Sequence, residues 1–463
     1  MKKEETSLEV KIKSVAKRFA EEIKDQEIQV ISHFDTDGIT SAAIMIQALK
    51  KLDKKFSIKI VKNLEKEFIK TLAKDKLTIF LDLASSNINT IKEHFTKEVF
   101  IIDHHEIDQE IPEGINIINP ELHNQQKISS SCLTYLFCKQ INSENKELAK
   151  LAILGMIGDI LEKNIDKLNN GILEDGDIKK KRGLLIYPST RPLNRTLEFC
   201  SNPYIPGVTG NIKGVFELLR EVNLTPVKGK YKSLIELDDE EMERLVTAIM
   251  LRNPKTKNRE MLGDIFLIKL FNKLEDAREL SAMINACSRL GRSDIAIQLC
   301  MEIPEAKKKA EAIHARYKQF IISGLKFASE TEKTQGKDFI IINAKDKIKD
   351  TMAGTIAGIL SKSSLYEEGT IIITMAYYND GETSKLTLIE KDAQEISSKI
   401  KISARMVGEN GRNVREILKR VVDEIGGEVG GHAFAAGAMI SQTKEHEFID
   451  LLKKNLELEI VKI

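Results

Sequence analysis

Short runs of apolar, mostly β-branched residues alternate with stretches of helical periodicity along the first 160 or so residues. The apolar runs predict strands at residues 28–32, 56–61, 77–81 and 99–102. Apolar residues at helical spacing predict helices over residues 7–24, 39–52, 85–95, 129–141 and 147–161. Because strands that alternate with helices form parallel sheets covered on both faces, we expect an α/β fold with a doubly wound parallel sheet.

The pattern along the rest of the chain predicts two further regions. Residues 213–329 have a helical pattern that ends in one long helix at 304–327, and residues 338–463 again mix strands with helices, including strands at 385–390 and 399–405. We therefore expect a first domain at 1–210, a helical middle region with a connecting helix at 211–330, and a smaller α/β domain at 331–463. The basic run at residues 179–182 is interpreted as solvated surface, with phosphate contact as the alternative.

Composition narrows the function classes. The 463 residues carry 71 basic and 70 acidic side chains, so a nucleic-acid partner would have to use a local patch. Aromatic residues are 5% of the chain and Trp is absent, which disfavours a base-stacking platform. The five cysteines form no CxxC pair, as expected for a reducing compartment. With no signal peptide and no apolar run near the ~18 residues of a membrane span, we expect a cytoplasmic protein.

Polar side chains that can ligate metals follow the predicted strands. Asp103, His104 and His105 come directly after the apolar run at 99–102. A helix cap beside two chance histidines is the alternative, but the whole chain has only eight His. Similar residues end two other strands and one helix, and the full set is His33, Asp35, Asp37, Asp82, Asp103, His104, His105 and Asp159.

This set predicts a metal site. Parallel strands deliver their carboxyl ends to one ligand-binding edge. Five carboxylates cannot lie together in a dry crevice unless cations compensate their charge. Carboxylate oxygens with some imidazole and no thiolate select manganese or magnesium.

Two glycine pairs, 426–427 and 430–431, precede His432 in the last domain. Glycines let backbone N–H groups approach a ligand closely, so we favour a ligand clamp over a flexible loop.

These residues resemble the motifs of a known superfamily. The segments His33-Phe34-Asp35-Thr36-Asp37-Gly38, Leu81-Asp82, Asp103-His104-His105 and Gly158-Asp159 are similar to the four motifs of the DHH phosphoesterases. The run from Gly430 to Ala438 resembles the Gly-Gly-His signature of their associated substrate-binding domain. Within the superfamily the chain is most similar to archaeal RecJ-like exonucleases, also called GINS-associated nucleases. No all-β stretch corresponds to the OB-like DNA-binding domain that the bacterial enzymes add.

The resemblance implies a role for each position. His33, Asp35 and Asp82 would hold one of two divalent cations, manganese in preference to magnesium. Asp82 would bridge to a second ion, whose other ligands would be Asp37, His104 and Asp159. Asp103 would orient its neighbours, and His105 would contact the phosphate or donate to the leaving oxygen, so that Asp37, Asp103 and His105 form the catalytic set. The substrate-binding set would be Gly430, Gly431, His432, Arg405 and Ser403.

Three function classes follow from the resemblance. The first is a single-strand-specific exonuclease on DNA or RNA, in replication or repair. The second is a phosphodiesterase for small oligonucleotides, and the third is an inert scaffold subunit of the archaeal replicative helicase. We favour the first, because every ligand type is present and because a small-substrate enzyme has no use for the helical middle region. That region would serve as a strand channel or as a docking surface for GINS-type proteins.

Overall fold

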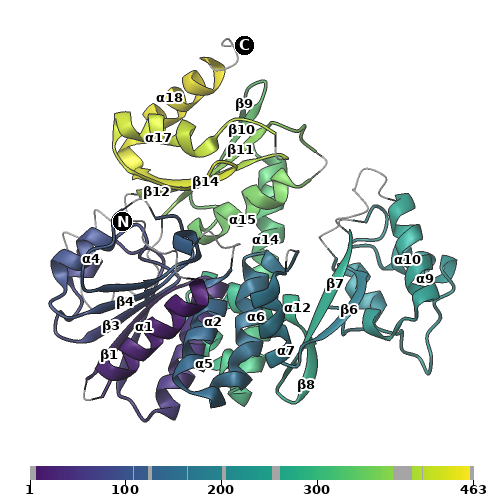
Figure 1. Ribbon diagram of the computed structural model, residues 1–463. Helices are drawn as coiled ribbons and strands as arrows, with labels where there is room; N and C mark the ends of the chain where they lie inside the picture. The colour runs from purple at the N-terminus through teal and green to yellow at the C-terminus, as the bar shows by residue number, and fades with distance from the viewer. Residues whose placement is uncertain are drawn as a thin grey trace. The chain divides into compact units, whose positions relative to one another are not determined.

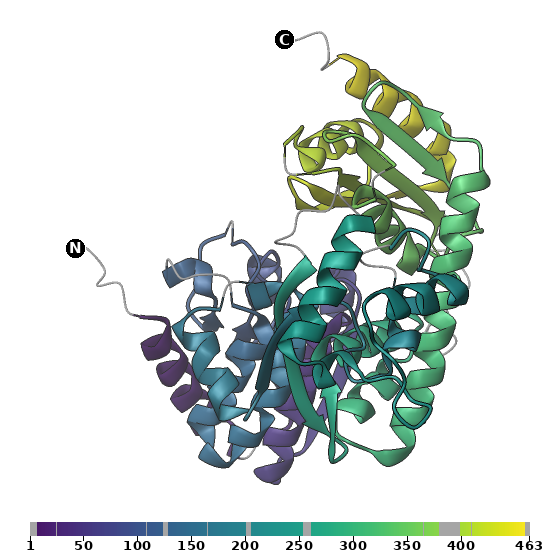
Figure 2. The same cartoon turned by 90° about the vertical axis from the view of Figure 1, so that its right-hand side faces the viewer.

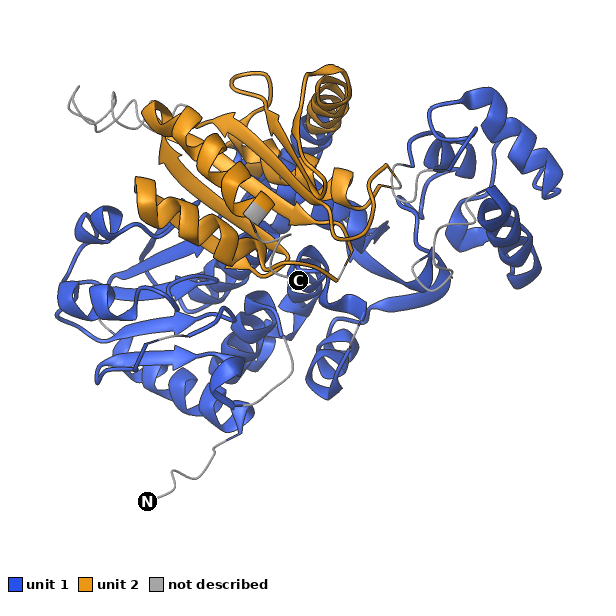
Figure 3. Cartoon of the chain, turned by 90° about the horizontal axis from the view of Figure 1, so that it is seen from above, with its two compact units in different colours: residues 1–288, 292–314 blue, residues 289–291, 315–463 orange. Residues whose placement is uncertain are grey.

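The structure is a computed structural model. It describes residues 7–24, 26–107, 109–123, 128–163, 165–200, 205–252, 261–363, 365–378, 399–408 and 410–458. The chain forms two compact units, which Figure 3 distinguishes by colour. The first consists of Met1–Ser288 and Arg292–His314, and the second of Arg289–Gly291 and Ala315–Ile463. The division into three parts at residues 210 and 330 stays a prediction.

A five-stranded sheet forms the centre of the first unit (Figure 1). In spatial order its strands are β2 (Phe56–Val61), β1 (Ile28–His33), β3 (Leu77–Leu81), β4 (Val99–Ile102) and β5 (Ile115–Ile118). Every neighbouring pair is parallel, which confirms the predicted doubly wound sheet. The strand order reverses between β1 and β3, and such a switch point is where open α/β sheets bind their ligands.

Helices cover both faces of this sheet. One face carries α1 (Leu8–Glu22), α2 (Thr36–Lys51), α5 (Ser130–Ile141) and α6 (Ala149–Gly158), and the other carries α3 (Lys66–Lys70) and α4 (Ile88–His94). Successive residues of β1 serve the two faces, since Val30 is buried with α2 and Ile31 is buried with α4. Because β3 and β4 are buried along their whole length, their sequences are apolar apart from Thr78 and do not alternate with polar residues.

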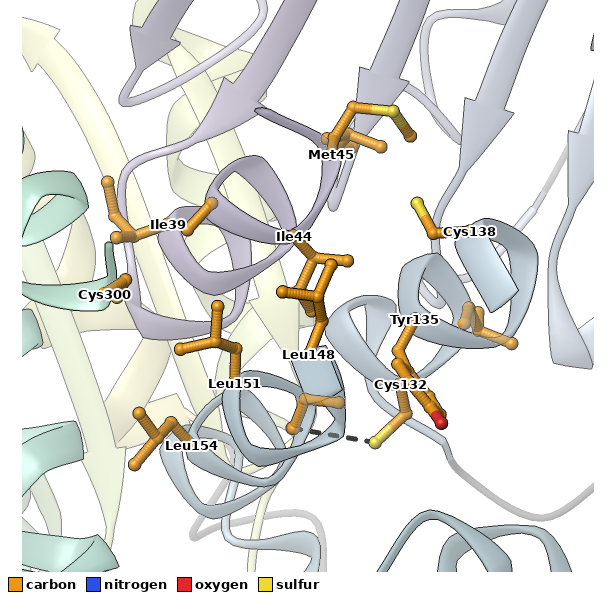
Figure 4. Packing of buried hydrophobic residues seen from close by; sticks show 14 of the residues in the cluster. Ile39, Ile44, Met45, Cys132, Tyr135, Cys138, Leu148, Leu151, Leu154 and Cys300 are labelled. Carbon is orange, nitrogen blue, oxygen red and sulfur yellow. Dashed lines mark hydrogen bonds between the residues drawn. The ribbon is translucent and has the colours of Figure 1, made fainter. Parts of the chain in front are cut away.

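Helices α2, α5 and α6 pack closely against one another through buried side chains (Figure 4). Ile44 of α2, Cys132 of α5 and Leu151 of α6 are fully buried in one cluster. The Cys132 thiol points back to the carbonyl of Ala152, 3.7 Å away. Because protein interiors are close-packed, these contacts restrain the three helices relative to one another.

Helix α2 starts earlier than the sequence pattern predicts. The pattern places the start at residue 39, after Gly38, whereas the structure starts the helix at Thr36. Asp35 is the N-cap, and its Oδ1 accepts a hydrogen bond from the N–H of Gly38 at 3.0 Å. Asp37 therefore lies in the first helical turn and not in a loop.

A three-stranded antiparallel sheet interrupts the predicted helical region 211–330. Its strands are β6 (Lys179–Leu184), β7 (Leu262–Leu270) and β8 (Lys273–Asp276). The prediction of helix throughout is wrong at residues 262–276, because a continuous apolar run does not distinguish a buried strand from a helix. Helices occupy most of the rest, and they are α9 (Ile212–Glu221), α10 (Asp239–Arg252), α12 (Ala277–Arg289), α13 (Ser293–Cys300) and α14 (Pro304–Glu330, Figure 2).

The segment between β6 and β7 has a hydrophobic core of its own. It includes α8 (Leu193–Glu198) together with α9 and α10. The preceding helix is α7 (Lys167–Asp175). In the basic run of β6, Lys181 donates to the carbonyls of Ile235 and Leu237 at 2.8 and 2.6 Å. Lys180 forms an ion pair with Asp264 at 2.9 Å, so two of these cations are used within the fold.

The second unit contains a six-stranded mixed sheet. In spatial order its strands are β13 (Glu428–His432), β14 (Ala435–Ser441), β12 (Lys399–Met406), β11 (Ile371–Tyr377), β10 (Phe339–Asn343) and β9 (Thr334–Gln335). Helix α15 (Asp350–Ser361) packs on β11 and β12, while α17 (Val414–Ile425) and α18 (Glu445–Leu458) cover the sheet's hydrophobic core. The predicted strand at 385–390 lies outside the described residues. Within the described ranges, no helix has the length and apolar character needed to cross a membrane.

Candidate metal centre and substrate-binding hairpin

The Asp82 carboxylate lies between two imidazoles at the switch point of the first sheet. Its Oδ2 is 3.3 Å from Nδ1 of His33, the last residue of β1. Its Oδ1 is 3.5 Å from Nε2 of His104, which follows β4. The same nitrogens approach two more carboxylates, because His33 lies 3.1 Å from Asp35 Oδ2 and His104 lies 3.6 Å from Asp159 Oδ2. One side chain thus joins two groups of potential ligands.

The backbone after β3 adopts an unusual conformation that presents Asp82. Asp82 has φ +60° and Ala84 has φ +98°. The left-handed region is uncommon outside glycine, although Asp tolerates it better than most residues. The chain therefore leaves the sheet abruptly, and the Asp82 side chain stays buried at the edge where β1 and β4 also end.

Asp37 is held by the start of helix α5. Its Oδ2 accepts from the N–H of Ser130 at 2.6 Å and its Oδ1 from the N–H of Ser131 at 3.0 Å. The partial positive charge of a helix N-terminus stabilises a carboxylate at this position. Gly155 of α6 leaves room for the contact, since a Cβ there would lie 2.4 Å from Asp37 Oδ1 and 2.1 Å from Ser131 Oγ.

Two further glycines bring the ligand segments together. A Cβ on Gly38 would lie 2.3 Å from the carbonyl oxygen of His33. A Cβ on Gly158 would lie 2.7 Å from the Cβ of Thr36. Both glycines therefore permit backbone approaches that a larger residue would prevent.

Two buried carboxylate oxygens in this cluster have no hydrogen-bond donor, namely Oδ1 of Asp82 and Oδ2 of Asp159. A buried carboxylate without donors is costly unless a cation compensates it. Ligand atoms within 4.8 Å of one another form the groups His33–Asp35–Asp82, Asp37–His104–Asp159 and Asp82–His104–His105. This mixture of carboxylate oxygen and imidazole nitrogen fits manganese or magnesium. The assignment of individual ligands to each ion stays a prediction.

The electrostatics also indicate an excess of negative charge. Burial raises the pKa of Asp82 well above its usual range, and the charges of Asp35 and Asp37 raise it further. Burial and the same two neighbours raise the pKa of Asp159. A bound cation would supply the positive charge that keeps both carboxylates ionised.

The two imidazoles respond to this environment in opposite ways. Burial lowers the pKa of His104, which favours the neutral imidazole that a metal requires. Burial opposes protonation of His33 as well, but the adjacent Asp35 charge and hydrogen bond outweigh it and raise the pKa of His33. In turn, His33 and the Gly38 N–H overcome the effect of burial on Asp35 and lower its pKa.

Asp103 is fully buried and organises the two histidines that follow it. Its carboxylate accepts from the N–H of Ser85 at 2.9 Å and of His104 at 2.8 Å. Its Oδ1 also lies 2.7 Å from Nδ1 of His105. Burial alone would raise the pKa of Asp103, but these contacts hold it below its usual range. Because a carboxylate only accepts, His105 carries a proton on Nδ1 and presents Nε2 elsewhere.

His105 is the most exposed of these side chains, with 47% of it accessible. Burial lowers the pKa of His105, but the hydrogen bond and charge of Asp103 outweigh this and raise it. A partly exposed imidazole of raised pKa next to a carboxylate cluster is suited to donate a proton.

In the second unit, strand pairing gathers the predicted substrate-binding residues. Gly430, Gly431 and His432 are exposed on the edge strand β13. The register places Gly430 opposite Gly437, and Gly437 opposite Ser403. The same pairing through Ala435 puts His432 in line with Arg405, so all the predicted residues except Gly431 share one face of the sheet.

Gly431 allows a close backbone contact beside that face. Gly431 has φ +112°, and a Cβ there would lie 2.5 Å from the carbonyl oxygen of Ala435. Arg405 donates to the carbonyls of Ala404 and Ala436 at 2.8 and 3.3 Å. Burial lowers the pKa of Arg405, with a further contribution from the charge of Arg289. A half-buried guanidinium next to another arginine is a favourable place for an anion.

Comparison with known protein families finds matches over both the candidate metal centre and the substrate-binding hairpin. Residues 27–157 match the model of the DHH family N-terminal domain, residues 186–259 match the DHH-CID domain, and residues 336–458 match the DHHA1 domain. The chain therefore combines a DHH domain with a DHH-CID domain and a DHHA1 domain.

Two curated relatives of this DHH protein illustrate the range of the similarity. An uncharacterised protein of Methanocaldococcus jannaschii is 29% identical over 455 residues, which is 95% of each chain. A protein of Bacillus subtilis, named a putative prophage-derived single-strand DNA-specific exonuclease, is 25% identical over 268 residues. That match covers 52% of this chain and 46% of the relative.

Solved structures share the fold of the DHH protein. The manganese-bound exonuclease RecJ superposes with a TM-score of 0.57 over 95% of this chain and 93% of its own, at 17% identity. CDC45 from Entamoeba histolytica gives a TM-score of 0.65 over 96% and 99%, at 12% identity. At these identities the likeness shows the fold alone.

Some residues that build the site of this DHH protein are absent from the predicted set. Asn119 is buried and donates to Ser85 Oγ at 3.1 Å and to the carbonyl of His105 at 2.9 Å. It directly follows β5, so the rule that polar residues end the strands could have found it. Ser130 and Ser131 contribute backbone N–H groups, for which no residue pattern exists.

Proposed function

We propose that this DHH protein is a divalent-metal-dependent exonuclease that hydrolyses phosphodiester bonds of single-stranded DNA or RNA. The observation that carries the proposal is the position of Asp82, between His33 and His104, with one buried oxygen that has no donor. The name of the Bacillus subtilis relative supports the same activity. Manganese is the preferred ion and magnesium the second choice.

In this proposal the ligands divide into two groups that share Asp82. His33 and Asp35 hold the first ion with it, and the second ion is held by Asp37, Asp82, His104 and Asp159. When bound, such ions stabilise negative charge on the phosphate and lower the pKa of water. The Ser130 and Ser131 amides hold the Asp37 side chain in this orientation.

The remaining polar residues position the substrate and move a proton. Asp103 fixes the ring of His105 through Nδ1, and the exposed side of that ring donates a proton to the leaving oxygen. In the second unit, His432 and the backbone of Gly430 and Gly431 bind a neighbouring phosphate, with Arg405 and Ser403 beside them. Phosphate contacts carry no sequence information, so we expect little base preference.

We also propose a protein partner for the DHH-CID segment at residues 186–259. The resemblance to archaeal RecJ-like enzymes suggests GINS-type replication proteins. This segment has its own core and exposes apolar side chains, among them Phe199 and Phe216. Such exposed apolar residues suit a binding surface.

The decisive experiment is degradation of end-labelled single strands of DNA and RNA with Mn²⁺, with Mg²⁺ and with excess chelator. We expect mononucleotides from linear strands only with a metal, and no cutting of a circular single strand. The Asp82→Ala variant should be inactive, whereas Asp264→Ala, which changes a surface carboxylate on β7, should retain activity. Cutting in chelator or of circles would contradict the proposal, and an inactive wild type would favour the scaffold alternative.

A further inference from the structure

Two cations lie over the ring of Phe320 on the long helix α14. The Arg316 guanidinium, one helical turn earlier, is 5.4 Å from the ring centroid, and the Lys349 ammonium is 4.8 Å from it. Lys349 is the N-cap residue of α15, so this ring joins the two helices. Because cations are attracted to the face of an aromatic ring, Phe320 holds both side chains at one place on the surface.

This pair of cations has no acidic partner. Neither Arg316 nor Lys349 forms an ion pair with any carboxylate of the described residues, and the neighbouring ion pairs use other lysines, Lys326 and Lys347. Two like charges that share one ring repel each other. An anion bound beside the ring would relieve this repulsion.

The sequence around the pair is basic, although the whole chain has a net charge of only +1. Residues 312–329 of α14 include three Lys or Arg residues and no Asp or Glu, and residues 345–349 include three lysines and one aspartate. Gln319 and Ser323, which share the helix face of Arg316 and Phe320, are exposed. This face is polar and positive, as a surface that binds a phosphate backbone should be.

Helix α15 connects this pair to the proposed phosphate-binding residues of the second unit. A Cβ on Gly354, in the second turn of α15, would lie 3.4 Å from Nη2 of Arg405. In the first turn, Arg289 donates to the carbonyl of Thr351 at 2.8 Å. Lys349 directly precedes this turn. Arg405, Arg289 and Lys349 therefore lie beside successive parts of one helix, from its second turn to its N-cap.

We propose that Arg316, Phe320 and Lys349 form a binding surface for single-stranded nucleic acid, on which the two cations contact phosphates further along the strand that His432 binds. The inference rests on the nuclease function proposed above and extends the path of its substrate within the second unit. Contacts of this kind neutralise phosphates without reading bases. An acidic protein segment is the competing occupant, but the continuity with Arg405 along α15 favours a strand.

The test is fluorescence anisotropy with a labelled oligo-dT strand, in excess chelator so that the strand stays intact. The double variant Arg316→Gln/Lys349→Gln should bind roughly tenfold more weakly at low salt, as expected for two lost surface ion pairs. The slope of log affinity against log salt should become shallower by about 1.4, because each phosphate of a single strand contributes about 0.7. Phe320→Leu keeps both charges, so it should lose about two- to fivefold in affinity without a change in slope.

The matched control is Lys419→Gln/Lys454→Gln, which removes the same charge from exposed positions of α17 and α18. These helices cover the opposite face of the sheet, because Ile373 packs into their core whereas the adjacent Thr374 donates to the carbonyl of Ala353 in α15. The control should bind the strand as the wild type does.

Wild-type affinity and slope in Arg316→Gln/Lys349→Gln would overturn the inference in favour of an acidic protein. An equal loss of affinity in the Lys419→Gln/Lys454→Gln control would overturn it as well, because the effect would then be one of total charge. Since binding is measured without cutting, a wild type that lacks nuclease activity refutes the proposed function but leaves this result valid.

Discussion

Oδ1 of Asp82 lies 3.5 Å from Nε2 of His104 and has no hydrogen-bond donor. Since the other oxygen faces His33, the Asp82 carboxylate is shared between two groups of potential ligands. The consequences can be tested one residue at a time.

The Asp82→Asn variant should lose manganese binding and at least about 100-fold in activity, because an amide supplies neither the charge nor the shared ligand. The metal-free variant should remain folded, since an amide is nearly isosteric and removes a buried charge. Calorimetric titration with Mn²⁺ and thermal melting with and without the metal measure both effects. The Asp264→Asn control should bind manganese normally, and a normal isotherm for Asp82→Asn would refute the shared-ligand role.

The Gly155→Ala variant should be destabilised by about 1–3 kcal/mol and should bind manganese more weakly. The new methyl group would overlap with Asp37 and Ser131, so the carboxylate must move away from the start of α5. Gly171 provides a matched control, because it lies within α7 with nothing near its Cβ position. Gly171→Ala should stabilise by up to about 1 kcal/mol through helix propensity alone. Chemical denaturation and Mn²⁺ titration of both variants decide the matter.

The His432→Ala variant should raise KM for single-stranded substrates and leave the affinity for manganese unchanged. His432 belongs to the second unit, whereas all the proposed metal ligands belong to the first. Removal of a phosphate contact should also reduce the salt dependence of binding. His446→Ala, at an exposed position of α18, is the control. Loss of the manganese isotherm in His432→Ala would be incompatible with a role in substrate binding alone.

Asp175, which is not one of the proposed metal ligands, should also make stability depend on pH. Burial opposes its ionisation, but Lys139 and the hydroxyl of Tyr135, at 2.8 Å, outweigh this and lower the pKa of Asp175. A lowered carboxyl pKa stabilises the fold above the pKa of the unfolded chain, and the contribution disappears as pH falls through the folded value.

Urea denaturation of the wild type and Asp175→Asn measures this contribution. The wild type should be more stable by about 1 kcal/mol at pH 7, a modest value because Lys139 is partly exposed. The difference should shrink below pH 4 or so. A difference that is the same at pH 7 and at pH 3 would contradict the assignment.

The sequence pattern predicts the strands of the first sheet well, because buried parallel strands are short, apolar and β-branched. Strands β2, β3 and β4 have the predicted limits. The start of α2 is missed because Gly38 is usually a helix breaker, and only the structure shows that it is needed for the approach to His33. Strand β7 is missed because its central residues are buried without alternation.

The sequence likewise predicts one part of the candidate site and misses another. Side chains at strand ends can be predicted. The structure brings the His33 and His104 ring nitrogens within 3.3 and 3.5 Å of the Asp82 carboxylate. The backbone amides that hold Asp37 cannot be predicted, because their contribution depends on the position of α5 and not on the side chains of Ser130 and Ser131. The ion that each ligand binds stays a prediction.

The contact between Asp37 and the first turn of α5 also links the folding of this helix to the position of a proposed metal ligand. The amide protons of Ser130 and Ser131 end on the Asp37 carboxylate, so they exchange with solvent only when this contact opens. Local unfolding of the first turn of α5 therefore also releases the Asp37 carboxylate. Deuterium uptake at these two amides thus measures how often the Asp37 contact opens, and the measurement needs no substrate.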